Sequence, residues 1–319
     1  MTKTDPETRE QGSHYLQADG LIVPKLIAAA GLKPGESVLD AGAGRGAITD
    51  SLCQAVAPGG SVLAVEQDVE LADLMKDERW PGLRVVAGDV LKVNLPEPLN
   101  AIVANPPYRI LPALIRRLLD HGFGRAVLVV PRELADRLTA QPKSELYGKL
   151  TVQVASRAKC EFLFPVSKRS FDPPPAVASA AIRITPKPAV ALDALELSIL
   201  DDVLEAAWDG RKKTLRHALS PLATTLRLTP QDVSEGVTMV KGTDRRFTDV
   251  SPWEYTVLAR HLASCVRTRR TAELAAKKER RRKLKASGGA AASAEATGDL
   301  AENDSDDASP AGNDRTADS

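Results

Sequence analysis

Short apolar runs that alternate with amphipathic stretches fill the first half of the chain, and they restrict its fold more than any other feature. Five runs rich in Val, Leu and Ile lack the polar alternation of a half-exposed strand, which is typical of strands buried on both faces of a parallel sheet. They are SVLDAG (37–42), SVLAVE (61–66), LRVVAGD (83–89), NAIVAN (100–105) and RAVLVVP (125–131). The stretches AITDSLCQAVA, DVELADLMKDE, LPALIRRLLDHG and RELADRLTA between them carry apolar residues at helical spacing. Repeated β–α units predict an α/β fold with a doubly wound sheet.

The pattern changes after residue 150. LTVQVASRA (150–158), CEFLFPV (160–166) and SAAIRITPK (179–187) alternate or run apolar with no helix between them, which predicts antiparallel strands at one edge of the sheet. Apolar residues recur at helical spacing from Asp193 onward. We therefore expect an α/β domain over residues 13–190 and a small helical domain over residues 191–265, behind a flexible N-terminus at residues 1–12.

Composition excludes several classes of protein. Apolar residues make up 43% of the chain, and no apolar run approaches the roughly 20 residues that a membrane helix needs, so we expect no membrane association. Cys53, Cys160 and Cys265 lie far apart and show neither metal-type nor disulfide-type spacing. We therefore expect no metal site. The polar N-terminus does not resemble a signal peptide, so we expect a cytoplasmic protein.

The formal net charge is only +1, but basic and acidic residues are separated into two blocks in the C-terminal tail, residues 266–319. Residues 267–285 carry ten Lys or Arg against two Glu, whereas residues 295–319 carry eight Asp or Glu against one Arg. The first block could be a basic helix on RNA or DNA, with a disordered, solubilising tail as the alternative. We expect the acidic end to be a disordered, solubilising segment, because its Ala, Ser and Gly cannot pack a core.

Three glycines, Gly42, Gly44 and Gly46, follow the first expected strand in VLDAGAGRGAIT. Ligands of open α/β sheets bind at the carboxyl ends of strands, where glycines let the backbone approach them. The spacing also matches the dinucleotide fingerprint, so an NAD enzyme is an alternative. Asp40 argues against a pyrophosphate there, because two like charges about 4 Å apart repel by about 1 kcal/mol even in water. The same carboxylate favours S-adenosylmethionine, which carries a sulfonium and an ammonium group and no phosphate.

Two further acids follow at the ends of the next strands. Glu66 ends the second strand, where a carboxylate can accept from both ribose hydroxyls, and Asp89 ends the third, where it can accept from an adenine amine. Both residues could instead be N-caps of the following helices. Acids at three consecutive strand ends favour the cofactor site.

The fourth strand ends in NPPY, at Asn105–Tyr108. The exocyclic nitrogen of adenine is conjugated and therefore a poor nucleophile. If the Asn105 side-chain oxygen and the Pro106 carbonyl accept its hydrogens, the nitrogen is biased toward the pyramidal form that attacks. Two prolines fix these acceptors, and Tyr108 offers an aromatic face to a flipped base. A proline-stiffened turn with a capping Asn is the alternative. We expect Asn105, Pro106 and Tyr108 to be catalytic, in a displacement governed mostly by positioning.

Together these motifs resemble the ribosomal RNA adenine N6-methyltransferases, the KsgA and Erm group, over residues 12 to about 262. SHYLQADGLI stands where the family has its QNFL segment, and DAGAGRGAIT, AVEQD, AGDV and NPPYRI follow in the family's order. YGKLTVQVASRA, SKRSFDPPPAVASAAIRI and GRKKTLRHAL resemble later signatures of the small-subunit branch. His14, Asp40 and Pro106 stand where Asn, Glu and Leu are common, and the last gives the NPPY shared with DNA adenine methyltransferases.

The resemblance implies a Rossmann-like methyltransferase sheet over residues 13–190 and S-adenosylmethionine as cofactor. It implies cofactor contacts from His14, Leu16, Gly42, Glu66, Asp89 and Asn105. It also implies that Phe171 stacks on the target base, whereas without the resemblance a lone Phe before prolines is more often a core residue.

Basic residues in two segments are candidate RNA contacts. Lys168 and Arg169 adjoin Phe171, a pairing suited to a splayed base beside phosphates. A second group lies in DGRKKTLRHAL and comprises Arg211, Lys212, Lys213 and Arg216, for which a solvated helix face is the alternative. With the basic tail they form one candidate RNA footprint.

The expected function is S-adenosylmethionine-dependent methylation of adenine N6 in ribosomal RNA, by a monomer that binds the small ribosomal subunit during ribosome biogenesis. The expected reaction is dimethylation of adjacent adenines near the 3′ end of small-subunit rRNA. Within enzymes, the alternatives are an Erm-type enzyme on large-subunit rRNA and a DNA adenine N6-methyltransferase. An alternative of another class is a non-catalytic RNA-binding factor in ribosome assembly.

Overall fold

The structure of the chain is a computed structural model, and it describes residues 14–17, 20–76, 80–187, 192–240 and 244–295, with side chains as far as residue 282. The domain boundary expected at residues 190/191 lies outside the described residues. The N-terminal segment 1–12 and the acidic residues 296–319 lie outside them too.

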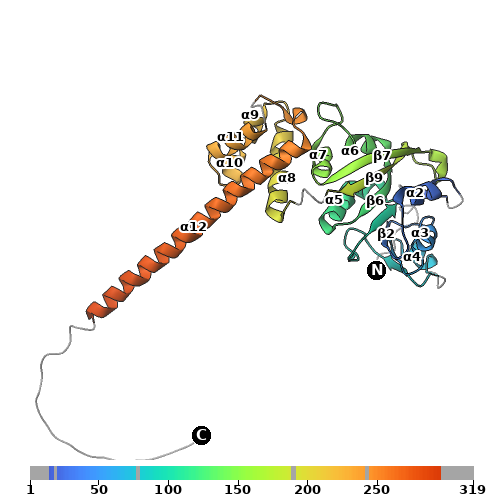
Figure 1. Ribbon diagram of the computed structural model, residues 1–319, viewed down its shortest axis with the longest axis horizontal. Helices are drawn as coiled ribbons and strands as arrows, with labels where there is room; N and C mark the ends of the chain where they lie inside the picture. The colour runs from blue at the N-terminus through green and yellow to red at the C-terminus, as the bar shows by residue number, and fades with distance from the viewer. Residues whose placement is uncertain (1–13, 18–19, 77–79, 188–191, 241–243, 296–319) are drawn as a thin grey trace, which may run out of the picture. The chain divides into compact units, whose positions relative to one another are not determined.

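A seven-stranded sheet forms the centre of the fold, in the order β4-β3-β2-β5-β6-β9-β7 (Figure 1). Its strands are β2 (Ser37–Ala41), β3 (Ser61–Glu66), β4 (Leu83–Ala87), β5 (Ala101–Ala104), β6 (Arg125–Pro131), β7 (Ala158–Val166) and β9 (Ser179–Pro186). The strands from β4 to β6 pair in parallel, whereas β9 runs antiparallel to both β6 and β7. The expected α/β class, the doubly wound sheet and its antiparallel edge are confirmed.

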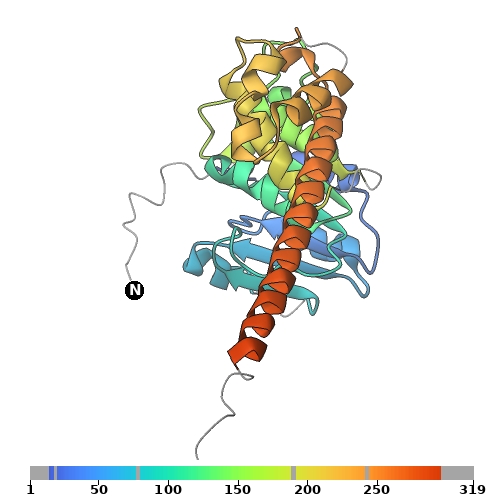
Figure 2. The ribbon, with the colours of Figure 1, turned by 90° about the vertical axis from the view of Figure 1, so that its left-hand side faces the viewer.

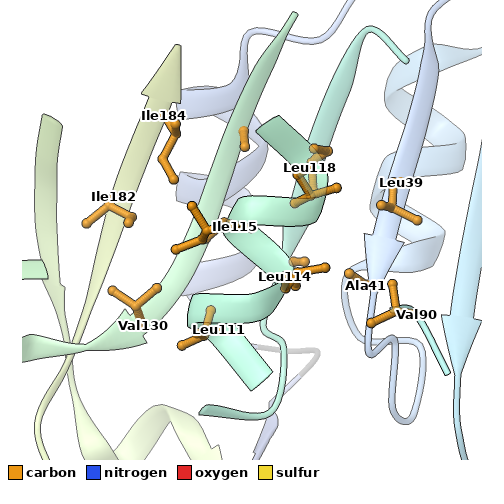
Figure 3. Packing of buried hydrophobic residues seen from close by; sticks show 14 of the residues in the cluster. Leu39, Ala41, Val90, Leu111, Leu114, Ile115, Leu118, Val130, Ile182 and Ile184 are labelled. Carbon is orange, nitrogen blue, oxygen red and sulfur yellow. The ribbon is translucent and has the colours of Figure 1, made fainter. Parts of the chain in front are cut away.

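Helices cover both faces of this sheet because successive strand residues point to opposite sides. In β2, Val38 packs in the core beneath α2 (Ile22–Ala30) and α3 (Thr49–Val56), whereas Leu39 packs beneath α5 (Leu111–His121) and α6 (Arg132–Leu138). Figure 3 shows the second face, where the apolar side of α5 lies on the sheet. A short helix, α4 (Val69–Leu74), connects β3 to the segment before β4.

The strand predicted from LTVQVASRA is wrong, because residues 149–155 form a helix, α7 (Lys149–Ala155). Thr151 fixes its first turn: its hydroxyl accepts from the Gly148 N–H and donates to the Arg137 carbonyl. Val154 packs in the sheet core, whereas Val152 packs in a second, helical core. Burial on two sides removes the amphipathic spacing of a helix and leaves an alternation that resembles a strand.

The second core lies in the C-terminal helical part, which the sequence predicts. Its helices are α8 (Ala194–Asp209), α9 (Leu215–Leu219), α10 (Leu222–Thr225), α11 (Pro230–Met239) and α12 (Pro252–Glu295). Capping boxes begin α8 at Asp193 and α11 at Thr229. Of the described residues, those up to Val266 form one compact unit and those from Arg267 to Glu295 belong to a second. Within the described ranges, no helix combines the length and apolarity that crossing a membrane requires.

Candidate active site

One pocket lies at the carboxyl ends of the central strands, and we call it the strand-end pocket. It is lined by His14, Tyr15, Leu16, Asp40, Gly42, Ala43, Gly44, Arg45, Ala47, Ile48, Glu66, Asn105, Pro106, Pro107 and Tyr108. A neighbouring pocket, the side pocket, shares Gly42, Glu66 and Pro107 with it, and its further lining includes Asp89, Arg109 and Ile110. Because β2 pairs with both β3 and β5, residues from three motifs of the sequence meet at this edge. The expected cofactor residues and the NPPY motif therefore line two adjoining pockets.

The loop after β2 requires glycine at two positions that line the strand-end pocket. Gly42 and Gly44 have φ values of +75° and +59°, a region that other residues rarely adopt. A Cβ at Gly42 would lie 2.9 Å from Cδ of Pro107, and one at Gly44 would lie 2.7 Å from the Tyr15 ring. This loop, which we call the glycine loop, thus packs directly against the NPPY segment and against Tyr15.

Glu66 and Asp89 bind backbone amides at the ends of their strands. Glu66 accepts from the N–H groups of Gly44 at 2.8 Å and Asp68 at 3.0 Å, which fixes the glycine loop to the end of β3. Asp68, rather than Glu66, is the N-cap of α4. Asp89 accepts from the Leu91 N–H at 2.9 Å and lies two residues beyond the end of β4. Both carboxylates keep further lone pairs for hydroxyl or amine donors.

Asp40 is the buried charge of the strand-end pocket, with a side chain that is 1% exposed. Its Oδ2 accepts from the Thr49 hydroxyl at 2.8 Å, but its Oδ1 has no hydrogen-bond partner among the residues that the structure describes. Burial raises the pKa of Asp40 to about 7, and the charge of Glu66 adds to the shift. A buried acceptor without a donor is rare and suits a cationic ligand, so the pocket fits a sulfonium or ammonium group and not a pyrophosphate.

We expect Asp40→Asn to change the pH dependence of stability and of ligand binding. Because the pKa of Asp40 lies near 7 in the folded chain and near 3.8 in the unfolded chain, its stabilising effect is complete below about pH 4 and lost as the pH rises toward 7. The variant should therefore gain stability relative to the wild type over this range. S-adenosylmethionine, being a cation, should bind the wild type more tightly as the pH approaches 7, and the variant weakly at every pH.

Thermal unfolding and calorimetric titration between pH 4 and 8 check this expectation. Asp73→Asn is the matched control, because Asp73 is an exposed carboxylate in α4 whose one ion pair among the described residues is with Lys76. An Asp40→Asn protein with the pH profiles of the wild type would contradict the assignment.

Asn105 directly follows β5, and within the described part of the chain its side chain makes one hydrogen bond. Its Nδ2 donates to the His14 carbonyl at 2.8 Å. Since a carbonyl can only accept, the amide nitrogen must face His14 and the amide oxygen must face the other way. That oxygen is buried and has no partner among the described residues. Asn105 therefore presents a fixed, unused acceptor inside the strand-end pocket.

Tyr108 begins a short 3-10 helix, η1 (Tyr108–Ile110), immediately after the two prolines. Its hydroxyl lies 2.7 Å from the Ser179 hydroxyl, and burial raises the pKa of Tyr108 above its usual value. Ser179 is buried at the start of β9, the strand next to β6. The Ser179 contact fixes the direction of the Tyr108 ring at the pocket.

We expect Ser179→Ala and Tyr108→Phe each to lower the turnover number of methyl transfer by about two- to tenfold, the value of one hydrogen bond. Because both changes remove the same bond, the double variant should lose no more than either single variant. Steady-state kinetics of the four proteins measures this coupling, and additive losses would show that Ser179 does not act through Tyr108.

Residues 14–16 line the strand-end pocket and are held there by contacts with residues far along the chain. The strand β1 (Tyr15–Leu16) pairs antiparallel with β8 (Phe171–Asp172). The Arg45 guanidinium lies 4.8 Å from the centroid of the Tyr15 ring, and its Nη1 lies 3.1 Å from Oδ2 of Asp172. Arg45 therefore joins the glycine loop to both strands of this small sheet.

Phe171 is buried at the start of β8, in the small sheet that β1 and β8 form. Its side chain is 1% exposed and packs in the sheet core with Leu16 and Val166, because β8 pairs with β1. Phe171 is therefore a core residue in this structure, and its stacking on a base stays a prediction. The rings of Tyr15 and Tyr108 both line the strand-end pocket, and Tyr108 follows Asn105 in the NPPY motif.

The candidate RNA contacts lie outside the lining of both pockets. Lys168 and Arg169 are exposed in the 3-10 helix η2 (Lys168–Ser170), directly before β8. Arg211, Lys212 and Lys213 are exposed in the turn between α8 and α9, where the Arg211 guanidinium stacks on Trp208. Their contact with RNA stays a prediction.

Comparison with known proteins connects this geometry to one family. The family described as "Ribosomal RNA adenine dimethylase" matches residues 7–253. The "Ribosomal RNA small subunit methyltransferase A" of Gloeobacter violaceus is 36% identical over 263 residues, which cover 79% of this chain and 92% of that protein. The "Probable ribosomal RNA small subunit methyltransferase A" of Methanopyrus kandleri is 35% identical over 213 residues, which cover 66% of this chain and 75% of that protein.

Two solved structures share the fold. A dimethyladenosine transferase from Plasmodium falciparum superposes with a TM-score of 0.67 and 24% identity, over 76% of this chain and 96% of that chain. The 23S rRNA methyltransferase ErmE superposes with a TM-score of 0.60 and 24% identity, over 78% of this chain and 99% of that chain.

Proposed function

Because the chain belongs to the ribosomal RNA adenine dimethylase family and is therefore a ribosomal RNA adenine methyltransferase, we propose that it dimethylates N6 of adjacent adenines near the 3′ end of small-subunit rRNA, with S-adenosylmethionine as methyl donor. The observation that carries the proposal is a pair of buried acceptors in one pocket, Oδ1 of Asp40 and Oδ1 of Asn105, for which the described residues offer no hydrogen-bond donor. The Asp40 oxygen suits the positive charge of the donor, and the Asn105 oxygen suits the amine of the base. Relatives named for the small subunit favour that substrate over the large-subunit rRNA of an Erm-type enzyme.

Residues of the two pockets would hold the donor along the edge of the sheet. When bound, S-adenosylmethionine supplies a methyl group on a sulfonium cation. Asp40 offers its free oxygen to positive charge, and Glu66 offers its remaining lone pairs to hydroxyl donors. Asp89 stands in the side pocket, where it can accept from the amine of an adenine ring. Gly42 separates these positions without a side chain that would fill the space between them.

Asn105 and Pro106 would hold the target amine. Oδ1 of Asn105 and the Pro106 carbonyl accept its hydrogens and draw the nitrogen lone pair out of conjugation with the ring. The hydrogen bond to His14 keeps the Asn105 amide from turning away, and the prolines keep the backbone rigid. Tyr108, fixed by Ser179, supports the face of the base. The transfer then requires alignment rather than a strong base, and the proton of the methylated amine leaves to water.

A substrate comparison tests this function. Purified protein is incubated with S-adenosylmethionine carrying a labelled methyl group and with one of three acceptors: unmodified small-subunit particles, large-subunit rRNA or duplex DNA. We expect label in N6,N6-dimethyladenosine of the small-subunit rRNA alone. Label in either of the other acceptors would identify an alternative substrate, and no label in any of them would favour the non-catalytic assembly factor.

A further inference from the structure

We propose that residues 267–282 of α12, the basic segment, bind the phosphate backbone of RNA in the small ribosomal subunit, as a contact in addition to those of the active site. The inference rests on the proposed function for its substrate. The segment carries eight Lys or Arg against two Glu, and all sixteen residues are exposed. Figures 1 and 2 show α12 as one continuous helix.

Helical geometry gathers most of these charges on one side of α12. At about 100° per residue, six of the eight basic residues fall within a stripe about 140° wide and about 23 Å long. The stripe consists of Arg267, Arg270, Lys277, Lys278, Arg281 and Arg282. Glu273 and Glu279 fall outside it on opposite sides. The positive charge is therefore concentrated toward one partner surface rather than spread around the helix.

The composition of the basic segment favours phosphates over other partners. Leu274 is its one large apolar residue and is 61% exposed, so the segment has no apolar seam for a partner helix. A membrane-surface helix likewise needs an apolar face opposite its charges. Six of its eight basic residues are arginines, whose planar guanidinium groups match phosphate oxygens in pairs. Since the family acts on ribosomal RNA, the phosphates are those of RNA.

Binding through this stripe has a measurable electrostatic signature. Each phosphate that a basic side chain neutralises releases counterions, which steepens the decrease of RNA affinity with salt by about one logarithmic unit per contact. The stripe would also raise the local concentration of the active site at its substrate. Its loss should therefore raise KM for the RNA and leave kcat unchanged.

Two full-length double variants with the same charge change test the stripe. Arg270→Gln/Arg281→Gln removes two arginines within the stripe, whereas Arg269→Gln/Arg280→Gln removes two from the other side of the helix. We expect the first variant to weaken binding of small-subunit rRNA by at least about fivefold near 0.15 M salt, to lower the salt slope by about two, and to keep kcat. The second variant should show less than half of this change. Equal effects of the two variants, or no effect of either, would overturn the proposal.

A third protein ends at Glu295 and lacks the acidic segment 296–319. This segment is the alternative occupant of the stripe that the experiment must distinguish from RNA. If this truncation makes RNA binding much tighter while the stripe variant of the full chain binds like the wild type, the acidic end is the occupant and the proposal fails. The test also separates this inference from the proposed function. Wild-type methyl transfer with an unchanged KM in the stripe variant refutes the stripe alone, whereas stripe-dependent RNA binding without methyl transfer refutes the function alone.

Discussion

Asn105→Ala should lower methyl transfer to small-subunit rRNA by at least about 100-fold, because it removes a preorganised acceptor that acts on the reacting nitrogen. The donor should still bind within about tenfold of the wild-type affinity, since the variant loses one hydrogen bond to the His14 carbonyl, worth about 0.5 to 1.5 kcal/mol. Single-turnover kinetics with saturating RNA, together with calorimetric titration of the donor, separates the two effects.

Asn100→Ala is the matched control for this prediction. Asn100 precedes β5 as Asn105 follows it, and its Oδ1 accepts from the Ser37 N–H at 2.8 Å, at the opposite end of the strand from the pocket. The control should lose about 1 to 3 kcal/mol of unfolding free energy and keep its activity. Equal losses of activity in both variants would show that Asn105 is only a structural residue.

Gly42→Ala is the second change with a large expected effect, because it moves the NPPY segment. The new Cβ would lie 2.9 Å from Cδ of Pro107 and 3.4 Å from Cα of Pro106. Neither proline ring can rotate away, so the backbone that carries Asn105 must shift. A displacement of this kind can cost about 100-fold in rate, and we expect a loss of that order in methyl transfer.

Gly59→Ala separates this displacement from backbone strain. Gly59 has φ +81°, close to the +75° of Gly42, but a Cβ at Gly59 would meet nothing within 4 Å. Both variants should lose about 1 to 2 kcal/mol of unfolding free energy from the left-handed conformation. Methyl transfer, measured well below the unfolding temperature, should fall in Gly42→Ala alone. Wild-type activity in Gly42→Ala would contradict the placement of the prolines against the glycine loop.

The sequence predicted the central strands well because each lies between glycine, proline or polar residues. Residues 61–66 and 125–131 form strands over the full expected ranges, whereas the expected strand 83–89 ends two residues early, at Ala87. Burial on both faces gives these strands a continuous apolar signal that survives in the sequence. For α7 the same kind of burial was misleading, because a helix between two cores has no polar side.

Strand ends and the NPPY motif located the candidate site, but the sequence could not predict the partners that hold it in shape. Asn105 is fixed by His14, 91 residues earlier, and Tyr108 by Ser179, 71 residues later. A serine at the start of a strand has no spacing that indicates such a contact. The burial of Phe171 likewise follows from the pairing of β8 with β1, which no local pattern encodes.

The most direct test of the central claim is a crystal structure of the protein with S-adenosylmethionine bound. We predict that positive charge of the donor lies against Oδ1 of Asp40, and that the methyl group on sulfur points toward the space beside Oδ1 of Asn105 and the Pro106 carbonyl. A donor bound elsewhere, or an Asn105 amide oxygen turned away from the sulfur, would contradict the account.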